Sequence, residues 1–207
     1  MNRAILVAVV ALSVLAGVVA AYLLRREPPP APLLHATLFD MPRPMPAMQL
    51  TDHEGRTYGA ERLQGRWTFL FFGFTNCPDI CPTTLATLAA VRAGLADLPA
   101  PERPEVVLVS VDPARDTPEV LARYVAHFDP SFAGVTGDAA AIEALTRELG
   151  IAVVIGAPGT DGSYTVDHTA AILLVDPDAA WTAVFGTPHR AETIAADYRA
   201  IVDRRSR

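Results

Sequence analysis

The spacing of hydrophobic positions changes along the chain, and the first zone is one long apolar segment. Residues 4–24 are almost entirely apolar, with Arg3 before them and Arg25 and Arg26 after them. About 20 apolar residues are enough for a helix to cross a bilayer, whereas the apolar part of a cleaved signal peptide has roughly 7–15. The pattern predicts a transmembrane anchor at residues 1–25. A signal peptide cleaved near Ala21 is the alternative.

A proline-rich stretch follows the apolar segment. Proline fixes φ and has no N–H to donate, so it favours extended conformations and disfavours helix interiors and central strands. We therefore expect a semi-rigid linker at residues 26–46 and a single folded domain at residues 47–207. The prolines of this stretch are Pro28, Pro29, Pro30, Pro32, Pro42, Pro44 and Pro46.

Within the expected domain, apolar positions alternate between the periods of strands and helices. Thr117 followed by Pro118 is typical of a helix start, and Gly150 is typical of a helix end. Strands that alternate with helices and then close with a hairpin and a helix predict an α/β fold with three layers, a mixed sheet and a thioredoxin-like order. Strand-like runs lie at 49–51, 57–58, 68–74, 106–111, 169–175 and 181–185, and helix-like stripes at 82–97, 118–128, 139–149 and 190–202.

Composition excludes several classes of function. The net charge is -6, and all 17 basic residues are arginine. A chain without lysine can form neither a Schiff base nor a Walker-type phosphate loop. An acidic chain without a cluster of basic residues is also a poor partner for nucleic acid.

The chain has two cysteines, Cys77 and Cys81, directly after the apolar strand at 68–74. Residues four apart share one face of a helix, with Cβ atoms about 5–6 Å apart, so the thiols could share a soft metal ion or close a disulfide. The N–H groups at a helix start favour thiolate, so we expect a lowered pKa for at least one of them. The pair is thus a candidate redox pair or part of a metal site. A purely structural disulfide is the alternative, and so short a loop would add little stability.

His168 is the histidine best placed to join the thiols, because in a thioredoxin-like sheet the entry of the strand at 169–175 lies close to the thiol turn. Two thiolates and one imidazole are a soft three-ligand set that suits Cu(I), whereas a structural zinc site ordinarily has four ligands. An ordinary surface or core histidine is the alternative. Asp167 either tunes the imidazole or is a solvated turn residue. The histidines without spaced partners, to which we assign no role, are His35, His53, His127 and His189.

Polar residues also follow the strand at 106–111, at the end of the strand where sites in α/β sheets usually lie. Asp116 and Thr117 are explained by capping of the next helix. Asp112 and Arg115 are candidates for holding this loop or meeting a partner.

Three methionines lie in or beside the proline-rich stretch: Met41, Met45 and Met48. Thioether sulfur is a Cu(I) ligand, so copper capture is one interpretation. Ordinary, irregular methionine usage in a linker is the simpler one.

Three motifs, in this order, resemble the Sco/SenC family of copper-binding proteins, which help to assemble the CuA centre of cytochrome c oxidase. The resemblance runs from about Met48 to the C-terminal helix. A lone C-x3-C would not be specific, whereas three motifs in order are. Asn76 stands where many relatives have histidine or another polar residue, a mild departure that leaves the ligands intact. The motifs are Phe71-Phe72-Gly73-Phe74-Thr75-Asn76-Cys77-Pro78-Asp79-Ile80-Cys81-Pro82, Ser110-Val111-Asp112-Pro113 with Asp116-Thr117-Pro118, and Val166-Asp167-His168.

The resemblance implies that Cys77, Cys81 and His168 are copper ligands, for Cu(I) and also for Cu(II), in a thioredoxin-like domain. It implies a single-pass protein of the inner membrane with its domain in the periplasm, an orientation that the flanking arginines leave undecided.

The expected role is that of a metallochaperone, rather than an enzyme, that delivers copper to oxidase subunit II. Other copper chaperones and thioredoxin-like reductants are further expected partners. Two alternatives stay open: a thiol–disulfide oxidoreductase that reduces the CuA-site cysteines through Cys77 and Cys81, and a redox or copper sensor.

Overall fold

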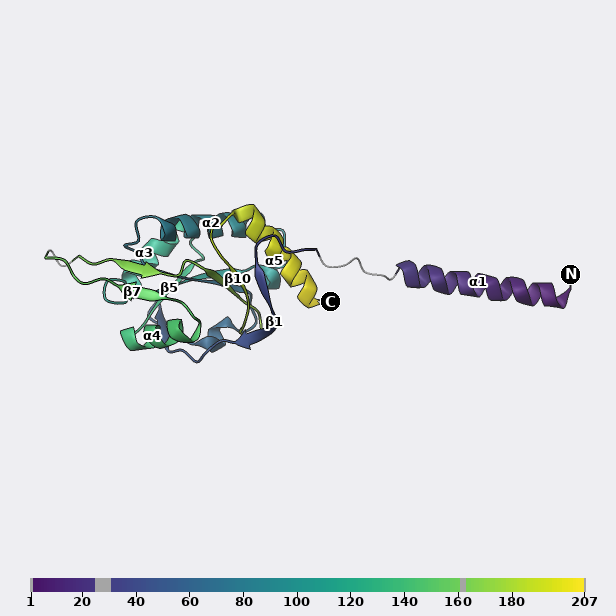
Figure 1. Cartoon of the computed structure of the whole chain (residues 1–207), viewed down its shortest axis with the longest axis horizontal. Coiled ribbons are helices and arrows are strands. Elements are labelled where there is room, and N and C mark those ends of the chain that lie inside the picture. Colours follow the sequence, from purple (N-terminus) through teal and green to yellow (C-terminus); the bar gives the residue numbers. More distant parts are fainter. Residues whose placement is uncertain (1, 25–30, 161–162, 207) are drawn as a thin grey trace. The chain divides into compact units, whose positions relative to one another are not determined.

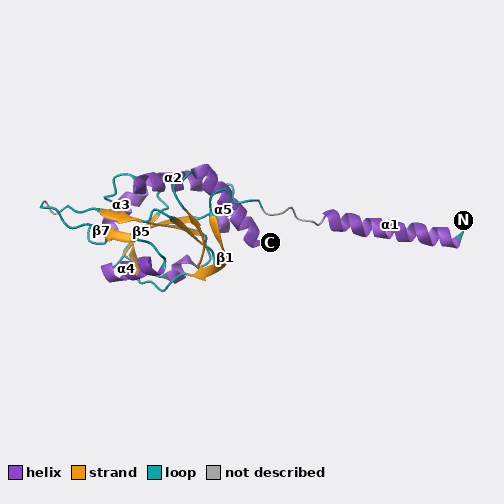
Figure 2. Cartoon of the chain, viewed as in Figure 1, coloured by secondary structure: helices purple, strands orange, loops and turns teal. Residues whose placement is uncertain are grey.

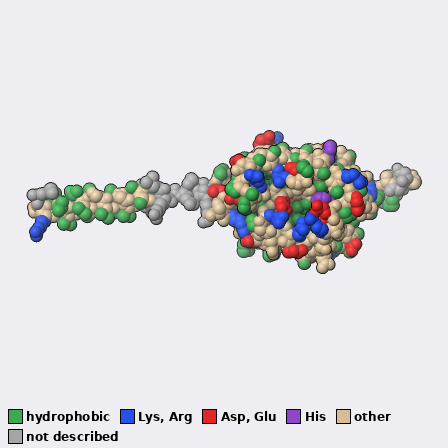
Figure 3. All heavy atoms as spheres, turned by 180° about the vertical axis from the view of Figure 1, so that it is seen from behind, with side chains coloured by type: hydrophobic (Ala, Val, Ile, Leu, Met, Phe, Trp, Pro, Cys, Tyr) green, Lys and Arg blue, Asp and Glu red, His purple; other side chains and the backbone are tan. Residues whose placement is uncertain are grey.

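The computed structural model describes residues 2–24, 31–160 and 163–206, and the chain divides into two compact units, Met1–Ala31 and Pro32–Arg207. The first unit contains helix α1 (Arg3–Leu24). Its segment Arg3–Ala21 has a mean hydropathy of 2.8 and is 0% buried, so it is long and apolar enough to cross a membrane. Hydrophobic side chains cover the helix along its length in Figure 3. The apolar helix predicted from the sequence is therefore confirmed as a helix.

The second unit is built on an eight-stranded mixed sheet with the strand order β1-β10-β9-β4-β5-β6-β2-β3. The central strands β4, β5 and β6 are parallel, and every other neighbouring pair is antiparallel. Strands β7 and β8 form a separate antiparallel ribbon. The strands are β1 (Thr37–Pro44), β2 (Leu50–Asp52), β3 (Thr57–Tyr58), β4 (Thr68–Gly73), β5 (Glu105–Ser110), β6 (Ala133–Thr136), β7 (Val153–Ile155), β8 (Val166–His168), β9 (Ile172–Val175) and β10 (Ala180–Phe185).

Helices cover both faces of this sheet, which gives three layers (Figures 1 and 2). Helices α2 and α3 connect successive parallel strands and lie on one face, where α5 packs against α2. Helix α4 lies on the other face. The predicted thioredoxin-like α/β fold with a mixed sheet is confirmed. The helices are α2 (Ile80–Gly94), α3 (Pro118–Phe128), α4 (Ala139–Glu148) and α5 (Ala191–Ser206), with short 3-10 turns at Ala60–Leu63 and Ala100–Glu102.

Local sequence explains why the central elements form where they do. Every residue of β4 and of β9 is buried, as expected for continuous apolar runs covered on both faces. The Thr117 hydroxyl accepts the Val120 N–H at 3.4 Å and caps α3, with Pro118 in its first turn. Gly150, at φ 68°, adopts the left-handed conformation that ends α4. The predicted start of α3 and the predicted end of α4 are confirmed, whereas the strand predicted at 169–175 begins only at Ile172.

The folded unit begins earlier than the boundary predicted at residue 47. Strand β1 pairs with β10 at the edge of the sheet, and Met45 is only 7% exposed. Proline is tolerated in an edge strand because half of the backbone N–H groups there need no partner. Pro42 lies where the pairing register of β1 with β10 shifts, between Leu38 and Arg43. The linker predicted at 26–46 is therefore wrong from residue 32 onward. Its first part, 26–30, lies outside the described residues.

Asp197 on α5 fixes the segment before β1 to the domain. Its carboxylate is 1% exposed and accepts the backbone N–H groups of Leu34, His35 and Ala36 at 2.6, 2.7 and 2.7 Å. A buried carboxylate that receives several N–H groups compensates its lost hydration with charge-assisted hydrogen bonds. Residues 34–36 are thus part of the folded unit.

Candidate metal centre

Cys77 and Cys81 reach the site from two different pieces of backbone. Strand β4 ends at Gly73, Cys77 lies in the turn that follows, and Cys81 lies in the first turn of α2. The prediction that both thiols project from one helical face is wrong, because the helix begins only at Ile80. The turn nevertheless brings the thiols together, and the Cys81 N–H donates to Cys77 Sγ at 3.4 Å.

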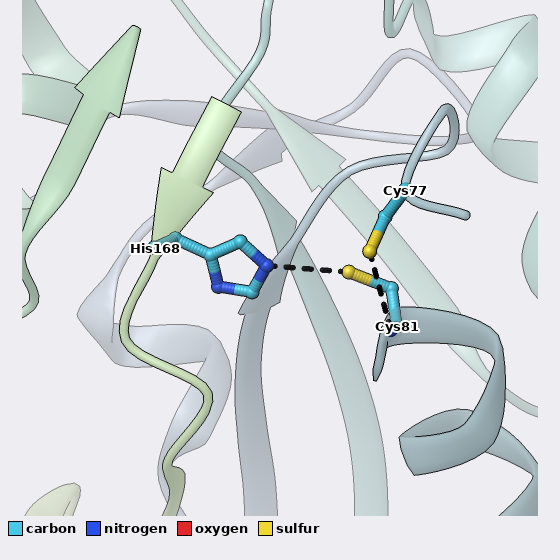
Figure 4. Close-up of side chains that lie close together, drawn as sticks. All are labelled: Cys77, Cys81 and His168. Atoms are coloured by element: carbon cyan, nitrogen blue, oxygen red, sulfur yellow. Dashed lines mark hydrogen bonds between the residues drawn. The ribbon is translucent and has the colours of Figure 1, made fainter. Parts of the chain in front are cut away.

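His168 completes the cluster from a third element (Figure 4). It is the last residue of β8 and so belongs to the separate ribbon, not to the entry of the sheet strand predicted at 169–175. Its Nε2 lies 3.3 Å from Cys81 Sγ. The ligand atoms of Cys77, Cys81 and His168 all lie within 4.8 Å of one another. The structure therefore brings together all three residues that the sequence predicted.

The imidazole of His168 is oriented for ligation. Its Nδ1 lies 3.1 Å from the Thr169 carbonyl oxygen, which can only accept, so Nδ1 carries the proton and the Nε2 lone pair faces the sulfurs. Burial lowers the pKa of His168, against the opposing effects of the Thr169 hydrogen bond and the Asp167 charge. Asp167 is exposed and makes no hydrogen bond that orients the ring. The imidazole is thus neutral at neutral pH, as a metal ligand must be.

Burial has the opposite consequence for the Cys81 thiol. Cys81 is 0% exposed, and its burial, followed by its hydrogen bond with Cys77, raises its pKa strongly. Cys81 is therefore not a thiol with the lowered pKa that was predicted for at least one of the pair, because the loss of hydration outweighs the hydrogen bond with the Phe74 backbone, which lowers the pKa. Cys77 is the more accessible of the two, at 9% exposed.

A shallow depression of about 300 Å³ opens onto Cys77 and His168. Aromatic side chains limit the movement of the imidazole, because Phe74 and Phe71 meet it edge to face with centroids 5.8 and 6.1 Å away. One side of the site is thus packed, whereas the other is open. The depression is lined by Phe74, Cys77, Pro78, Asp79, Ile80, Val166, Asp167 and His168.

Asp116 holds the cysteine turn from the side. Its carboxylate is 0% exposed and accepts the Thr75 N–H at 3.0 Å, the Thr75 hydroxyl at 2.6 Å and the Ser110 hydroxyl at 2.6 Å. The prediction that Asp116 caps α3 is wrong, since Thr117 alone does so. A polar residue at the end of a strand was the only sequence signal for this role.

Asp112 and Arg115 hold the loop as expected, and they do so through a residue that the sequence did not single out. Asp112 is 1% exposed, pairs with the Arg115 guanidinium and accepts the Tyr164 hydroxyl at 2.6 Å. Tyr164 precedes β8 and has no recognisable motif of its own.

The methionines of the expected linker are separated by the fold. Met45 packs in the core at 7% exposed, whereas Met41 is 81% exposed on β1. Met48 is half-buried against the core. Copper capture by the three as a group is therefore not supported, because Met45 has a packing role.

The site offers two sulfurs and one imidazole nitrogen, a set that suits a soft ion of low coordination number. A fourth protein ligand, as a closed zinc site needs, is not part of the cluster among the described residues. The site and the sheet together define a thioredoxin-like α/β domain with a dithiol–imidazole cluster that could hold a metal ion.

The chain belongs to the SCO1/SenC family, whose model matches residues 41–203. It is 37% identical over 150 residues to the human protein named SCO2 homolog, mitochondrial. The aligned region covers 72% of this chain and 56% of that protein. It thus spans little more than half the length of this relative.

Two solved structures with copper bound have the same fold. The Bradyrhizobium japonicum ScoI structure is 35% identical with a TM-score of 0.67 and covers 75% of this chain and 98% of that one. The Arabidopsis thaliana ScoI structure is 30% identical with a TM-score of 0.71, and the match covers 76% of this chain and 98% of that one.

Proposed function

We propose that this protein is a copper metallochaperone that delivers copper to the CuA site of cytochrome c oxidase during its assembly. One observation carries the proposal: the ligand atoms of Cys77, Cys81 and His168 converge within 4.8 Å. The copper-bound relatives support copper as the cargo. Cu(I) is the preferred state because the donors are soft, and Cu(II) is a second state for the same ligands.

The geometry favours release as well as binding. Three ligands leave copper open to an incoming thiolate or imidazole, and the depression beside Cys77 gives that ligand an approach. The metal can then move by exchange of ligands, one at a time, without passing through water. The proposed acceptor is oxidase subunit II, with other copper chaperones as suppliers.

We place the domain in the periplasm, tethered to the inner membrane by α1. The support is a helix of sufficient length and hydropathy, Arg3–Ala21, at the N-terminus. A periplasmic domain would share its compartment with copper-binding segments of the oxidase.

A thiol–disulfide oxidoreductase is the second candidate, favoured by the closeness of two free thiols. The more exposed Cys77 would attack a client disulfide, and Cys81 would resolve the mixed disulfide. Thioredoxin-like reductants would then restore the dithiol. A redox or copper sensor would use the same two thiols.

The two candidates differ in their need for His168. We expect His168→Ala to weaken Cu(I) binding at least about tenfold, because it removes one of three ligands, and to leave dithiol reductase activity intact. Cys77→Ser should abolish both properties. His127→Ala, at an exposed histidine on α3, is the matched control and should change neither. The measurements are chelator competition for Cu(I) and turnover of a disulfide substrate.

The chaperone proposal fails if His168→Ala keeps full copper affinity while Cys77→Ser removes only reductase turnover. In that case the oxidoreductase is the function.

A further inference from the structure

One loop, residues 111–117 between β5 and α3, contacts both halves of the metal centre. On the cysteine side, Asp116 binds the N–H and the hydroxyl of Thr75, at 3.0 and 2.6 Å, and Thr75 begins the turn that carries Cys77. The Ser110 hydroxyl, at the end of β5, donates to the same carboxylate at 2.6 Å. The cysteine turn is therefore fixed to the end of β5.

On the histidine side, the same loop holds Tyr164 in three ways. The Tyr164 hydroxyl donates to Asp112 Oδ1 at 2.6 Å. The Arg115 guanidinium lies 3.8 Å from the centre of the Tyr164 ring, and its Nη1 donates to the Tyr164 carbonyl oxygen at 3.4 Å. Arg115 also pairs with Asp112, so the two residues form one unit around the tyrosine.

Tyr164 matters because, among the described residues, no strand of the main sheet pairs with the segment that carries His168, whose other supports are the buried Val166 and the contacts of Phe71 and Phe74 with the imidazole. Strand β8 pairs with β7 alone, and this ribbon shares no strand with the main sheet. Its pairing continues at Thr169, whose N–H donates to the Ala152 carbonyl at 2.9 Å. Tyr164 is four residues before His168, about 13 Å along an extended chain, so it acts through the backbone and is not itself a ligand.

We propose that Tyr164 is a positioning residue for His168, because its contacts with Asp112 and Arg115 attach the β7–β8 ribbon to the loop that also fixes the cysteine turn. The loop then sets the separation of the imidazole from the two thiols. This inference rests on the proposed copper function, but its structural part can be tested without copper.

The test is a double-mutant cycle in the full chain, with Cu(I) affinity measured by chelator competition. Tyr164→Phe removes only the hydroxyl, and we expect about tenfold weaker binding, as when a hydrogen-bonded support of a metal ligand is lost. In a His168→Ala background the same change should alter affinity by less than about twofold, because the ligand through which it acts is absent. Tyr198→Phe is the matched control, since it removes a hydroxyl that donates to the Glu102 carbonyl at 2.5 Å elsewhere in the domain.

A second measurement uses the copper-free protein. Tyr164→Phe should speed hydrogen exchange of the Thr169 amide and leave the exchange of the α2 amides unchanged. The Tyr198→Phe control should leave the exchange of the Thr169 amide unchanged.

The proposal is overturned if Tyr164→Phe weakens copper equally with and without His168, if it leaves copper affinity unchanged, or if Thr169 exchange does not change. A wild-type chain that binds no copper would refute the proposed function instead, and the exchange measurement would still decide whether Tyr164 holds the ribbon.

Discussion

At residue 73 the sheet and the metal centre meet without a side chain between them. A Cβ atom on Gly73 would lie 2.9 Å from Cys81 Sγ and 3.0 Å from Phe71 Cε1. The first distance is shorter than packed atoms allow and the second is unusually tight, and both neighbours are fully buried. The glycine therefore makes room for the sulfur of Cys81.

Gly73→Ala should lower the free energy of unfolding by about 1–3 kcal/mol, the usual cost of overpacking, and should weaken copper binding by displacing the sulfur. Denaturant unfolding and chelator competition measure the two effects. Gly94→Ala is the control, because a Cβ at Gly94 meets nothing within 4 Å. Equal behaviour of the two variants would contradict this account of Gly73.

If Cys81 ligates copper as proposed, its raised pKa should make copper binding dependent on pH. At neutral pH the residue is a thiol, so the metal must displace its proton, and affinity should rise by up to about tenfold per pH unit for that proton. Chelator competition between about pH 6.5 and 8.5 tests the slope, because protons compete with the metal ion for the thiolate. Cys81→Ser should flatten the dependence; a wild-type affinity that does not change with pH would be inconsistent with a buried thiol.

The residue types of the site could be predicted from the sequence, but its supports could not. Cys77, Cys81 and His168 carry chemistry that few other side chains offer. Tyr164 and Asp116 are common residues, and their partners Asp112 and Thr75 lie 52 and 41 positions away in the chain. Only the folded sheet brings them into contact.

Among the secondary-structure elements, strands β2, β3, β4, β5, β9 and β10 were predicted, whereas β1, β6, β7 and β8 were not. β4 and β9 are fully buried, so hydrophobicity alone defines them. β7 exposes Val154 and Ile155 at 62% and 58%, and its partner β8 has three residues, of which Val166 is buried. The ribbon is therefore held by its own pairing and by a small buried contact, which leaves little hydrophobic pattern in the sequence. β1 was missed because its prolines are typical of a linker, and its edge position became clear only from the pairing with β10.

Asp197 gives β1 a testable support. Asp197→Asn replaces one acceptor oxygen by an amide that faces backbone N–H groups, so we expect a loss of about 1–3 kcal/mol of unfolding free energy. Hydrogen exchange at residues 34–36 should speed up as well. Glu192→Gln, at an exposed carboxylate of the same helix, should cost less than about 1 kcal/mol. Unchanged hydrogen exchange at residues 34–36 would show that the Asp197 hydrogen bonds do not support the segment before β1.

At the scale of the whole molecule, two units with different surfaces share one chain. The helix α1 has an apolar surface, whereas acidic and basic side chains are interspersed on the face of the domain drawn in Figure 3. The separation of an apolar helix from a folded domain was predicted from the sequence, because a continuous run of apolar residues differs from the periodic apolar positions of strands and helices in a folded domain. The residue at which the domain begins was not predicted, because it depends on tertiary contacts.

The anchor predicts that the intact protein stays in the membrane pellet after alkaline extraction, because about 20 apolar residues hold it in the bilayer. Immunoblotting of pellet and supernatant, with N-terminal sequencing, checks this. Release of a chain shortened near Ala21 would identify a cleaved signal peptide instead.

The attachment of residues 34–36 to Asp197 also determines which contacts of the domain would resist a pulling force applied through the N-terminal segment. Tension transmitted along the N-terminal segment meets the Asp197 hydrogen bonds first and the β1–β10 ladder next. Strands β10 and β9 then separate β1 from β4, the strand that leads to the cysteines. If α1 anchors the domain as proposed, tension along the N-terminal segment is therefore borne by the Asp197 hydrogen bonds and by β1 before it reaches the strand that leads to the cysteines.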